Sequence, residues 1–205
     1  ASDAQVRGLH SWIDNDSDRW IAAGSYNKLY IYSGAGIRYD ITPTGLTAGN
    51  EDALQPVGYG NSFYGQEYYG IARQEVTTIT PATTWAMDSW GEYLVACSSS
   101  DGKIYEWQLN TGTIAAPVTN APVGCRSILV TEERFLMALG AGSNPRLVQW
   151  SDRENNTVWT PSATNEAGSL EIQTSGRIRC GVKVQKKSLI LTDTDAHVAT
   201  YSGPP

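Results

Sequence analysis

Two acidic stretches are the first places where residue type and spacing could support metal chemistry. Residues 14–18 read DNDSD and begin like the calcium-binding loop of an EF-hand. The match then fails, because the sixth position is Arg19 where the loop requires glycine, and the twelfth is Ser25 where it requires glutamate. We interpret residues 14–18 as an acidic turn, and residues 192–196, TDTDA, as the turn of a hairpin.

Histidine and cysteine are too few and too scattered to predict a metal or catalytic centre. His10 and His197 each stand in an alternating segment without ligands at metal spacing, so we assign both a structural role. The three cysteines, Cys97, Cys125 and Cys180, fit neither a disulfide framework nor a zinc pattern. We expect all three to be buried apolar thiols.

No recognised catalytic motif is present in the sequence. A nucleophile elbow, a zinc-protease helix and a phosphate-binding loop are all missing from the 205 residues. Paired carboxylates for glycoside chemistry cannot be recognised when they lie on separate structural units, so that chemistry stays open. The prediction is a protein that is not an enzyme, with no catalytic residues, no cofactor and no metal.

Charge limits the partners that the chain can bind. A net charge of −6 and a pI of about 4.9 argue against a surface that binds nucleic-acid phosphates. An acidic wall would still suit a channel through which DNA passes without sticking. We expect no signal peptide, and the sequence has no apolar run near the ~18 residues of a membrane helix. Because the first residue is Ala1 and not Met, we expect a piece of a longer protein.

One five-residue pattern occurs four times and must be explained by the fold. A basic or imidazole residue, an aliphatic, two variable residues and an aromatic recur as KLYIY, KIYEW, RLVQW and HVATY, at residues 28–32, 103–107, 146–150 and 197–201. An apolar run and a polar turn precede each copy, which is the pattern of a β-hairpin. From the first aliphatic to the closing aromatic the separations are 11, 13, 14 and 12 residues (21 to 32, 94 to 107, 136 to 150, 189 to 201).

Further strands are predicted on both sides of each hairpin. Strands before the hairpins are expected at residues 6–12, 84–90, 126–131 and 178–184, and strands after the first three at residues 37–42, 112–118 and 156–161. Four-stranded units repeat with steps of 42 residues (94 to 136) and 53 residues (136 to 189), which is typical of β-propeller blades. The fold class is therefore all-β, a propeller of four-stranded antiparallel blades. We expect three to four blades in one domain over residues 1–205, whole or part of a larger propeller, with the closing aromatics between blades.

The step from the first hairpin to the second is too long for one blade. It measures 73 residues (21 to 94) and contains a Gly- and Tyr-rich insertion at about residues 45–83. This insertion is either a long surface loop or an arm that contacts a partner, for which Gly and Tyr are well suited. The candidate partner-binding residues are Tyr59, Phe63, Tyr64, Tyr68 and Tyr69. The alternative is that these side chains pack on their own blade.

Several separated motifs resemble one family. They are WSDRENNTVWTPSATNEAGSLEI (150–172), TPATTWAMDSWGEYLVAC (80–97), DGKIYEWQ (101–108), VGYGNSFYGQEYYGIAR (57–73) and LILTDTDAHVATYSGPP (189–205). Together they resemble a family of tailed-bacteriophage virion proteins and, more distantly, the propeller-bearing tube or nozzle proteins of short tails. The resemblance covers nearly the whole chain, and we expect the family's flanking regions at both ends to be absent from it.

This resemblance implies a function and a set of partners. It implies a non-enzymatic tail subunit of the virion, assembled in the host cytoplasm, in a ring of copies around the DNA channel. The implied partners are other copies of the chain, neighbouring tail and portal or adaptor proteins, and DNA as transient cargo, with no membrane insertion. Two alternatives stay open: a carbohydrate-binding or glycan-cleaving propeller for host recognition, and a cellular protein-interaction propeller.

Overall fold

β-Strands account for nearly all the regular structure of the chain. The computed structural model describes residues 4–54 and 79–203. Within these ranges it has fifteen strands and one short 3₁₀ turn, Ala141–Ser143, and no α-helix. No helix in the described part of the chain is long and apolar enough to cross a bilayer.

The strands form four antiparallel sheets, which are the blades of a β-propeller. Blade 1 consists of β1 (Gly8–Ile13), β2 (Arg19–Gly24), β3 (Leu29–Ser33) and β4 (Arg38–Asp40). Blade 2 consists of β5 (Trp85–Trp90), β6 (Tyr93–Ser98), β7 (Ile104–Trp107) and β8 (Ala116–Pro117). Blade 3 consists of β9 (Ser127–Val130), β10 (Leu136–Leu139), β11 (Leu147–Trp150) and β12 (Gly168–Glu171). Blade 4 consists of β13 (Ile178–Val184), β14 (Lys187–Thr192) and β15 (Ala196–Ala199).

Within each blade, strands that follow one another in the chain pair with one another. The four predicted hairpins are confirmed as the β2–β3, β6–β7, β10–β11 and β14–β15 pairs. In the first of them, Ile21 pairs with Tyr32, so the first aliphatic lies opposite the closing aromatic. Tight polar turns and alternating side chains therefore set the register of each meander.

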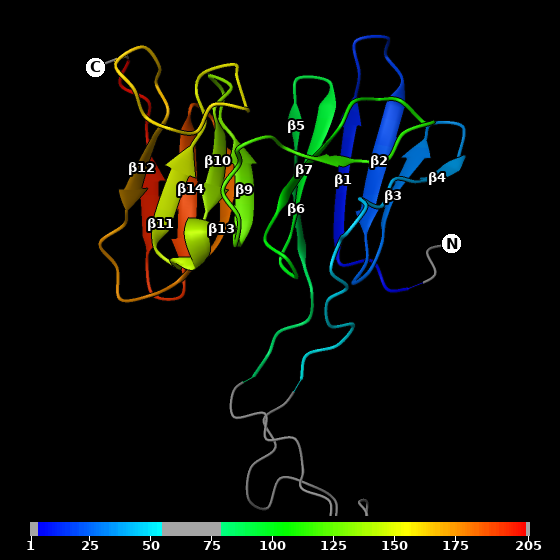
Figure 1. Cartoon of the computed structure of the whole chain (residues 1–205), viewed down its shortest axis with the longest axis horizontal. Coiled ribbons are helices and arrows are strands. Elements are labelled where there is room, and N and C mark those ends of the chain that lie inside the picture. The colour runs from blue at the N-terminus through cyan, green and yellow to red at the C-terminus, as the bar shows by residue number, and fades with distance from the viewer. Residues whose placement is uncertain (1–3, 55–78, 204–205) are drawn as a thin grey trace, which may run out of the picture.

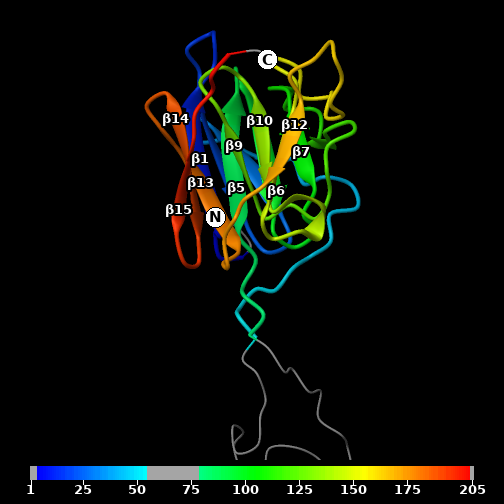
Figure 2. The same cartoon turned by 90° about the vertical axis from the view of Figure 1, so that its left-hand side faces the viewer.

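The blades stand side by side through their first strands. β1 lies next to β5, β5 next to β9, and β9 next to β13. The carboxylate of Asp88 in β5 accepts a hydrogen bond of 2.8 Å from the backbone N–H of Val130 in β9. Blade 1, drawn in blue, occupies one end of the molecule, and blades 3 and 4, in yellow-green to red, occupy the other (Figure 1). The perpendicular view looks along this row of blades, so that their first strands β1, β5, β9 and β13 overlap in projection (Figure 2).

Apolar clusters between consecutive blades hold the arrangement together. Between blades 1 and 2, Trp107 is 1% exposed and meets Trp20 edge to face, with ring centroids 5.4 Å apart. The prediction that closing aromatics lie between blades is confirmed here. The cluster between blades 2 and 3 contains Trp90 and Trp159, and the cluster between blades 3 and 4 is smaller. Each blade thus covers an apolar face of its neighbour, which a single meander cannot do for itself.

The predicted outer strand of blade 3 is wrong. Residues 156–161 form no strand, and the outer strand is β12, Gly168–Glu171. Trp159 is the reason, since its ring is buried against blade 2 and its indole N–H donates 2.7 Å to the carbonyl of Asn156. The apolar signal at residues 156–161 therefore comes from a side chain that fills an interface and not from strand pairing.

One of the three cysteines also departs from the prediction. Cys97 and Cys125 are buried, and burial raises the pKa of the Cys125 thiol to about 12 and that of Cys97 well above its usual value. Cys180 is exposed. It lies in β13 next to Gly181, which faces the leucines of blade 3, so the alternation of the strand points Cys180 away from blade 3.

Candidate binding site between the third and fourth blades

A cavity of about 650 Å³ opens between blades 3 and 4. Its lining includes the apolar side chains of Phe135, Met137, Trp150, Leu170 and Ala199. Charged side chains of both signs surround it: Glu132, Glu133, Glu166, Lys186 and Lys187. An apolar cavity with a few polar groups at its edge is the ordinary form of a ligand-binding site.

The cavity exists because blade 4 fills its interface poorly. In the cluster between blades 3 and 4, the only fully buried residues of blade 4 among the described ones are Ile178 and Ile190. Where the strands of blade 4 line the cavity, they contribute the small side chains Ser188 and Ala199 beside Lys187 and Val198. Wide side chains of blade 3 therefore face open space, and Leu170 is 63% exposed.

Tyr201 and Trp150 fix one wall of the cavity. The Tyr201 hydroxyl lies 3.1 Å from each carboxylate oxygen of Glu166, and its ring lies 5.3 Å from that of Phe135. The Trp150 indole N–H donates 2.8 Å to the carbonyl of Glu166. Partial burial, together with the adjacent Glu166 carboxylate, raises the pKa of Tyr201 above its ordinary value. The wall therefore combines aromatic surface with a phenol that stays protonated and a carboxylate that accepts hydrogen bonds.

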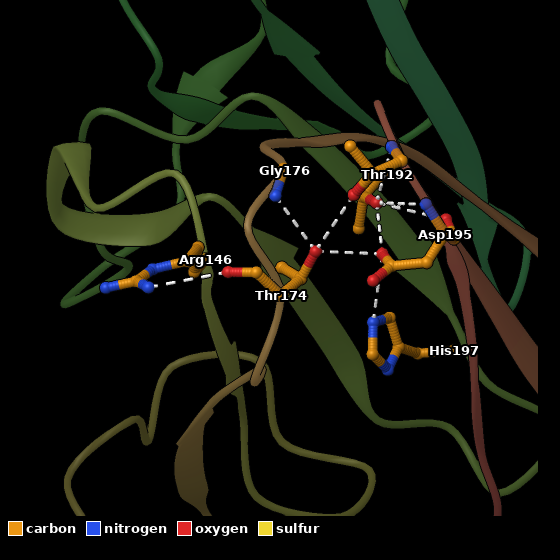
Figure 3. Close-up of polar contacts among 7 residues, drawn as sticks. Arg146, Thr174, Gly176, Thr192, Asp195 and His197 are labelled. Atoms are coloured by element: carbon orange, nitrogen blue, oxygen red, sulfur yellow. Dashed lines mark hydrogen bonds and ion pairs between the residues drawn. The ribbon is translucent and has the colours of Figure 1, made fainter.

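A polar cluster joins the same two blades at another place (Figure 3). The Oδ1 atom of Asp195 accepts hydrogen bonds from the hydroxyls of Thr174, at 2.9 Å, and Thr192, and lies 3.2 Å from Nε2 of His197. The hydrogen bond from Thr192, the largest cause, lowers the pKa of Asp195. Asp195 belongs to the β14–β15 turn, whereas Thr174 belongs to the segment that leads from blade 3 into blade 4.

This cluster resembles a catalytic triad only in its residue types. The Thr174 hydroxyl donates directly to Asp195 and not to the ring of His197, so the imidazole does not connect a nucleophile to the acid. The backbone N–H of Gly176 donates 3.0 Å to the same hydroxyl, and the carbonyl of Thr174 accepts 3.4 Å from Arg146. The cluster therefore anchors the linker between the blades.

The remaining residues singled out in the sequence have structural contacts. The ring of His10 lies 2.9 Å from the Ser89 hydroxyl across the interface of blades 1 and 2, and stacks on Trp12. Burial, the largest cause, lowers the pKa of His10. His10 and His197 lie in β1 and β15, as predicted. Tyr59, Phe63, Tyr64, Tyr68 and Tyr69 lie outside the described residues, so their predicted partner contacts stay predictions.

Both acidic stretches form turns, as predicted. The Asp14 carboxylate accepts backbone N–H groups from Asp16 at 3.0 Å and Asp18 at 2.9 Å, and the Trp20 indole N–H at 2.9 Å. Residues 193–195 connect β14 to β15. Over residues 4–54 and 79–203, no group of three or more His, Cys, Asp or Glu side chains could hold a metal ion.

Sequence reasoning did not predict the cavity. Its residues come from β10, β11, β12, β14 and β15 and from the connections around them, and they are spread from Thr131 to Gly203. None of them belongs to a recognisable motif. The signals available were the closing aromatics Trp150 and Tyr201, which mark positions where a blade meets its neighbour.

No protein-family model and no curated protein matches the chain. Among solved structures, the chain is similar to virginiamycin B lyase from Staphylococcus aureus, at 10% identity and a TM-score of 0.38, over 95% of this chain and 70% of that one. Nothing about the chemistry of this chain follows from so distant a likeness.

Proposed function

We propose that the chain is a non-enzymatic structural component of a bacteriophage tail, a subunit of a ring around the DNA channel. In this role it contacts other copies of itself and neighbouring tail or portal proteins, and DNA is only transient cargo. The described histidines support a structural role, since His10 and His197 serve interblade packing and a turn. The family resemblance of the sequence motifs supplies the phage context.

One observation carries the proposal: the two outermost blade faces are apolar and exposed. On blade 1, Gly8 faces Trp85 of blade 2, so Leu9 and Ile13 point away from blade 2 and are 68% and 59% exposed. On blade 4, Gly181 faces blade 3, and Val182 on the opposite face is 46% exposed. Exposed apolar sheet faces of this kind mark surfaces that another protein body covers.

The charge of the chain suits a channel wall. The net charge of −6 repels a DNA backbone and lets a duplex pass without binding. A stiff disc built of packed sheets also resists deformation, because protein interiors have low compressibility.

Mass spectrometry of purified virions tests this proposal. We expect peptides of the chain in the virions, and we expect antibody label at the tail in electron micrographs. Virions that lack these peptides would overturn the virion role.

A second candidate, a carbohydrate-binding propeller, is favoured by the cavity between blades 3 and 4. Trp150, Phe135 and Tyr201 offer aromatic surface, and Glu132, Glu133 and the two lysines offer acceptors and donors for hydroxyl groups. A glycan array probed with the wild-type chain and with Tyr201→Ala tests this candidate. Binding that the substitution abolishes would support it, and an array without signal would exclude it.

A further inference from the structure

The internal interfaces show the rule by which the blades associate. Each blade presents one face to the blade before it and the opposite face to the blade after it. In β5, for example, Ser89 points to His10 of blade 1, whereas Asp88 points to Val130 of blade 3. The rule leaves two faces uncovered by any described residue: the leading face on blade 1 and the trailing face on blade 4.

Both uncovered faces have the alternation of interior sheet faces. On the leading face, Leu9, Ile13 and Ile21 are 68%, 59% and 42% exposed. On the trailing face, Val182 pairs with Leu189 and Leu189 pairs with Val198, which places one apolar row across all three strands of blade 4. These rows would be solvated at a cost of roughly 25 cal/mol per Å² if nothing covered them.

The turns between first and second strands lie next to one another in consecutive blades. The Trp12 indole N–H, just before the turn of blade 1, donates 2.9 Å to the carbonyl of Glu92 in the turn of blade 2. Arg134 in the turn of blade 3 lies 5.4 Å from the centre of the Trp90 ring, at the turn of blade 2. The same rule would place the turn of blade 4 beside the turn of a following blade 1.

The charges of those two turns are complementary. The turn of blade 4 carries Lys186, and Lys187 follows it as the first residue of β14; both are exposed and also stand at the edge of the cavity. The turn of blade 1 carries Asp16 and Asp18, also exposed, while Asp14 holds the turn together. A trailing face that meets a leading face would thus bring two lysines beside two aspartates, which favours this pairing over others.

We infer that the occupant of both faces is a second copy of this chain, bound head to tail, so that two chains form one closed disc of eight blades. The trailing face of each copy covers the leading face of the other, and both interfaces are the same. Propellers typically have four to eight blades. Two copies of this four-bladed chain give eight blades, whereas three copies would give twelve, so we infer two copies. This inference rests on the assembly role proposed above, but not on the virion.

The mass of the purified chain in solution is the first test. Native mass spectrometry and light scattering should give twice the 22.2 kDa of one chain. Leu9→Asp with Ile13→Asp blocks the leading face, and Val182→Asp with Val184→Asp blocks the trailing face. Each double variant should be monomeric, with a Kd raised by at least about 100-fold. Ile114→Asp with Val123→Asp, equally exposed but away from both faces, is the matched control and should stay dimeric.

Mixing the two blocked variants identifies which faces meet. Each is monomeric alone, but together they retain one intact trailing-to-leading contact and should form a one-to-one heterodimer. This recovery also shows that both variants are folded. A face that binds its own kind instead would leave one variant dimeric, and that result would overturn the inference.

Charge reversal tests the turns separately. Asp16→Lys with Asp18→Lys, or Lys186→Glu with Lys187→Glu, should each weaken the dimer roughly tenfold, and all four together should restore it. A monomeric wild type would overturn this inference and leave the virion role to its own test. A dimer whose chain is missing from virions would overturn the virion role alone.

Discussion

Two of the three interblade contacts are closed by buried aromatic side chains, and the third remains open. Trp107 seals the contact of blades 1 and 2, and Trp159 seals that of blades 2 and 3, with exposures of 1% and 3%. At the contact of blades 3 and 4, Trp150 is only partly buried and borders a cavity of about 650 Å³. The same blade design therefore produces closed and open interfaces within one chain.

The difference between the closed and open contacts shows which segment of a blade fills the space between neighbouring blades. In blade 2 the segment after the third strand supplies Leu109 and Ala115 to the contact with blade 1. In blade 3 the equivalent segment supplies Trp159 to the contact with blade 2. In blade 4 that segment is described only to Gly203 and supplies Tyr201. The packing of each interface thus depends on the connection to the fourth strand of the later blade.

The largest expected effect on stability comes from replacing a tryptophan in a closed interface, compared with replacing one beside the cavity. Trp107→Ala should cost about 3–5 kcal/mol of unfolding free energy, because it leaves a large void in a closed interface. Trp150→Ala should cost about half as much, since its ring already borders open space. Urea denaturation of both variants measures the difference, and equal losses would contradict the distinction between closed and open interfaces.

Two glycines that touch tryptophans sharpen the same comparison. A Cβ on Gly24 would lie 2.4 Å from the Trp85 ring, and one on Gly168 would lie 2.4 Å from the Trp150 ring. Gly24→Ala should cost about 2–3 kcal/mol because Trp85 is enclosed, and Gly168→Ala about 1 kcal/mol because Trp150 can shift toward the cavity. Gly34→Ala, whose nearest contact would be 3.5 Å, is the control in the same denaturation series.

Enlarging an alanine should have opposite signs in the two regions. Ala138, fully buried in the contact of blades 2 and 3, has no room for a larger side chain, so Ala138→Leu should destabilise the fold by about 1–3 kcal/mol. Ala199→Leu adds apolar atoms to the cavity and should raise the melting temperature slightly. A loss of stability in the Ala199 variant would show that the cavity closes in solution.

The smallest expected effect is a pH dependence at the contact of blades 1 and 2. The pKa of His10 is lowered by burial and by Lys183, against an opposing effect of Asp88. The unfolded chain therefore binds a proton at His10 before the folded chain does, and stability falls as pH drops below about 6.5. His10→Gln should flatten this fall between about pH 7 and pH 5, measured by thermal melting, and an unchanged slope would assign the fall to other groups.

Local sequence patterns predicted the strands within each blade well. They predicted less well which side chains make contacts between blades. The spacing from Ile21 to Tyr32 and its repeats located the hairpins because both strands and the turn lie in one short segment. A strand was wrongly predicted at residues 156–161. Trp159, which is buried between blades 2 and 3, has the same apolar character in sequence as a strand residue. The prediction that Cys180 is buried was also wrong. Cys180 lies on the face of blade 4 that no described residue covers, so its thiol is exposed.

The candidate site was beyond sequence reasoning for a physical reason. The cavity arises because blade 4 leaves part of the space beside blade 3 unfilled. Small side chains such as Ser188 and Ala199 do not reveal in the sequence that the space next to them is empty. Its walls are contributed by segments that only the tertiary packing brings together.

Strand order in space follows strand order in the chain, blade after blade. Since the strands within a blade pair with their neighbours in the chain, each blade can form soon after its residues leave the ribosome, without waiting for distant partners. In an isolated chain, blade 4 has the smallest core behind it. Its amide hydrogens should therefore exchange with deuterium before those of blades 1 to 3, because the blade with the smallest core opens most often.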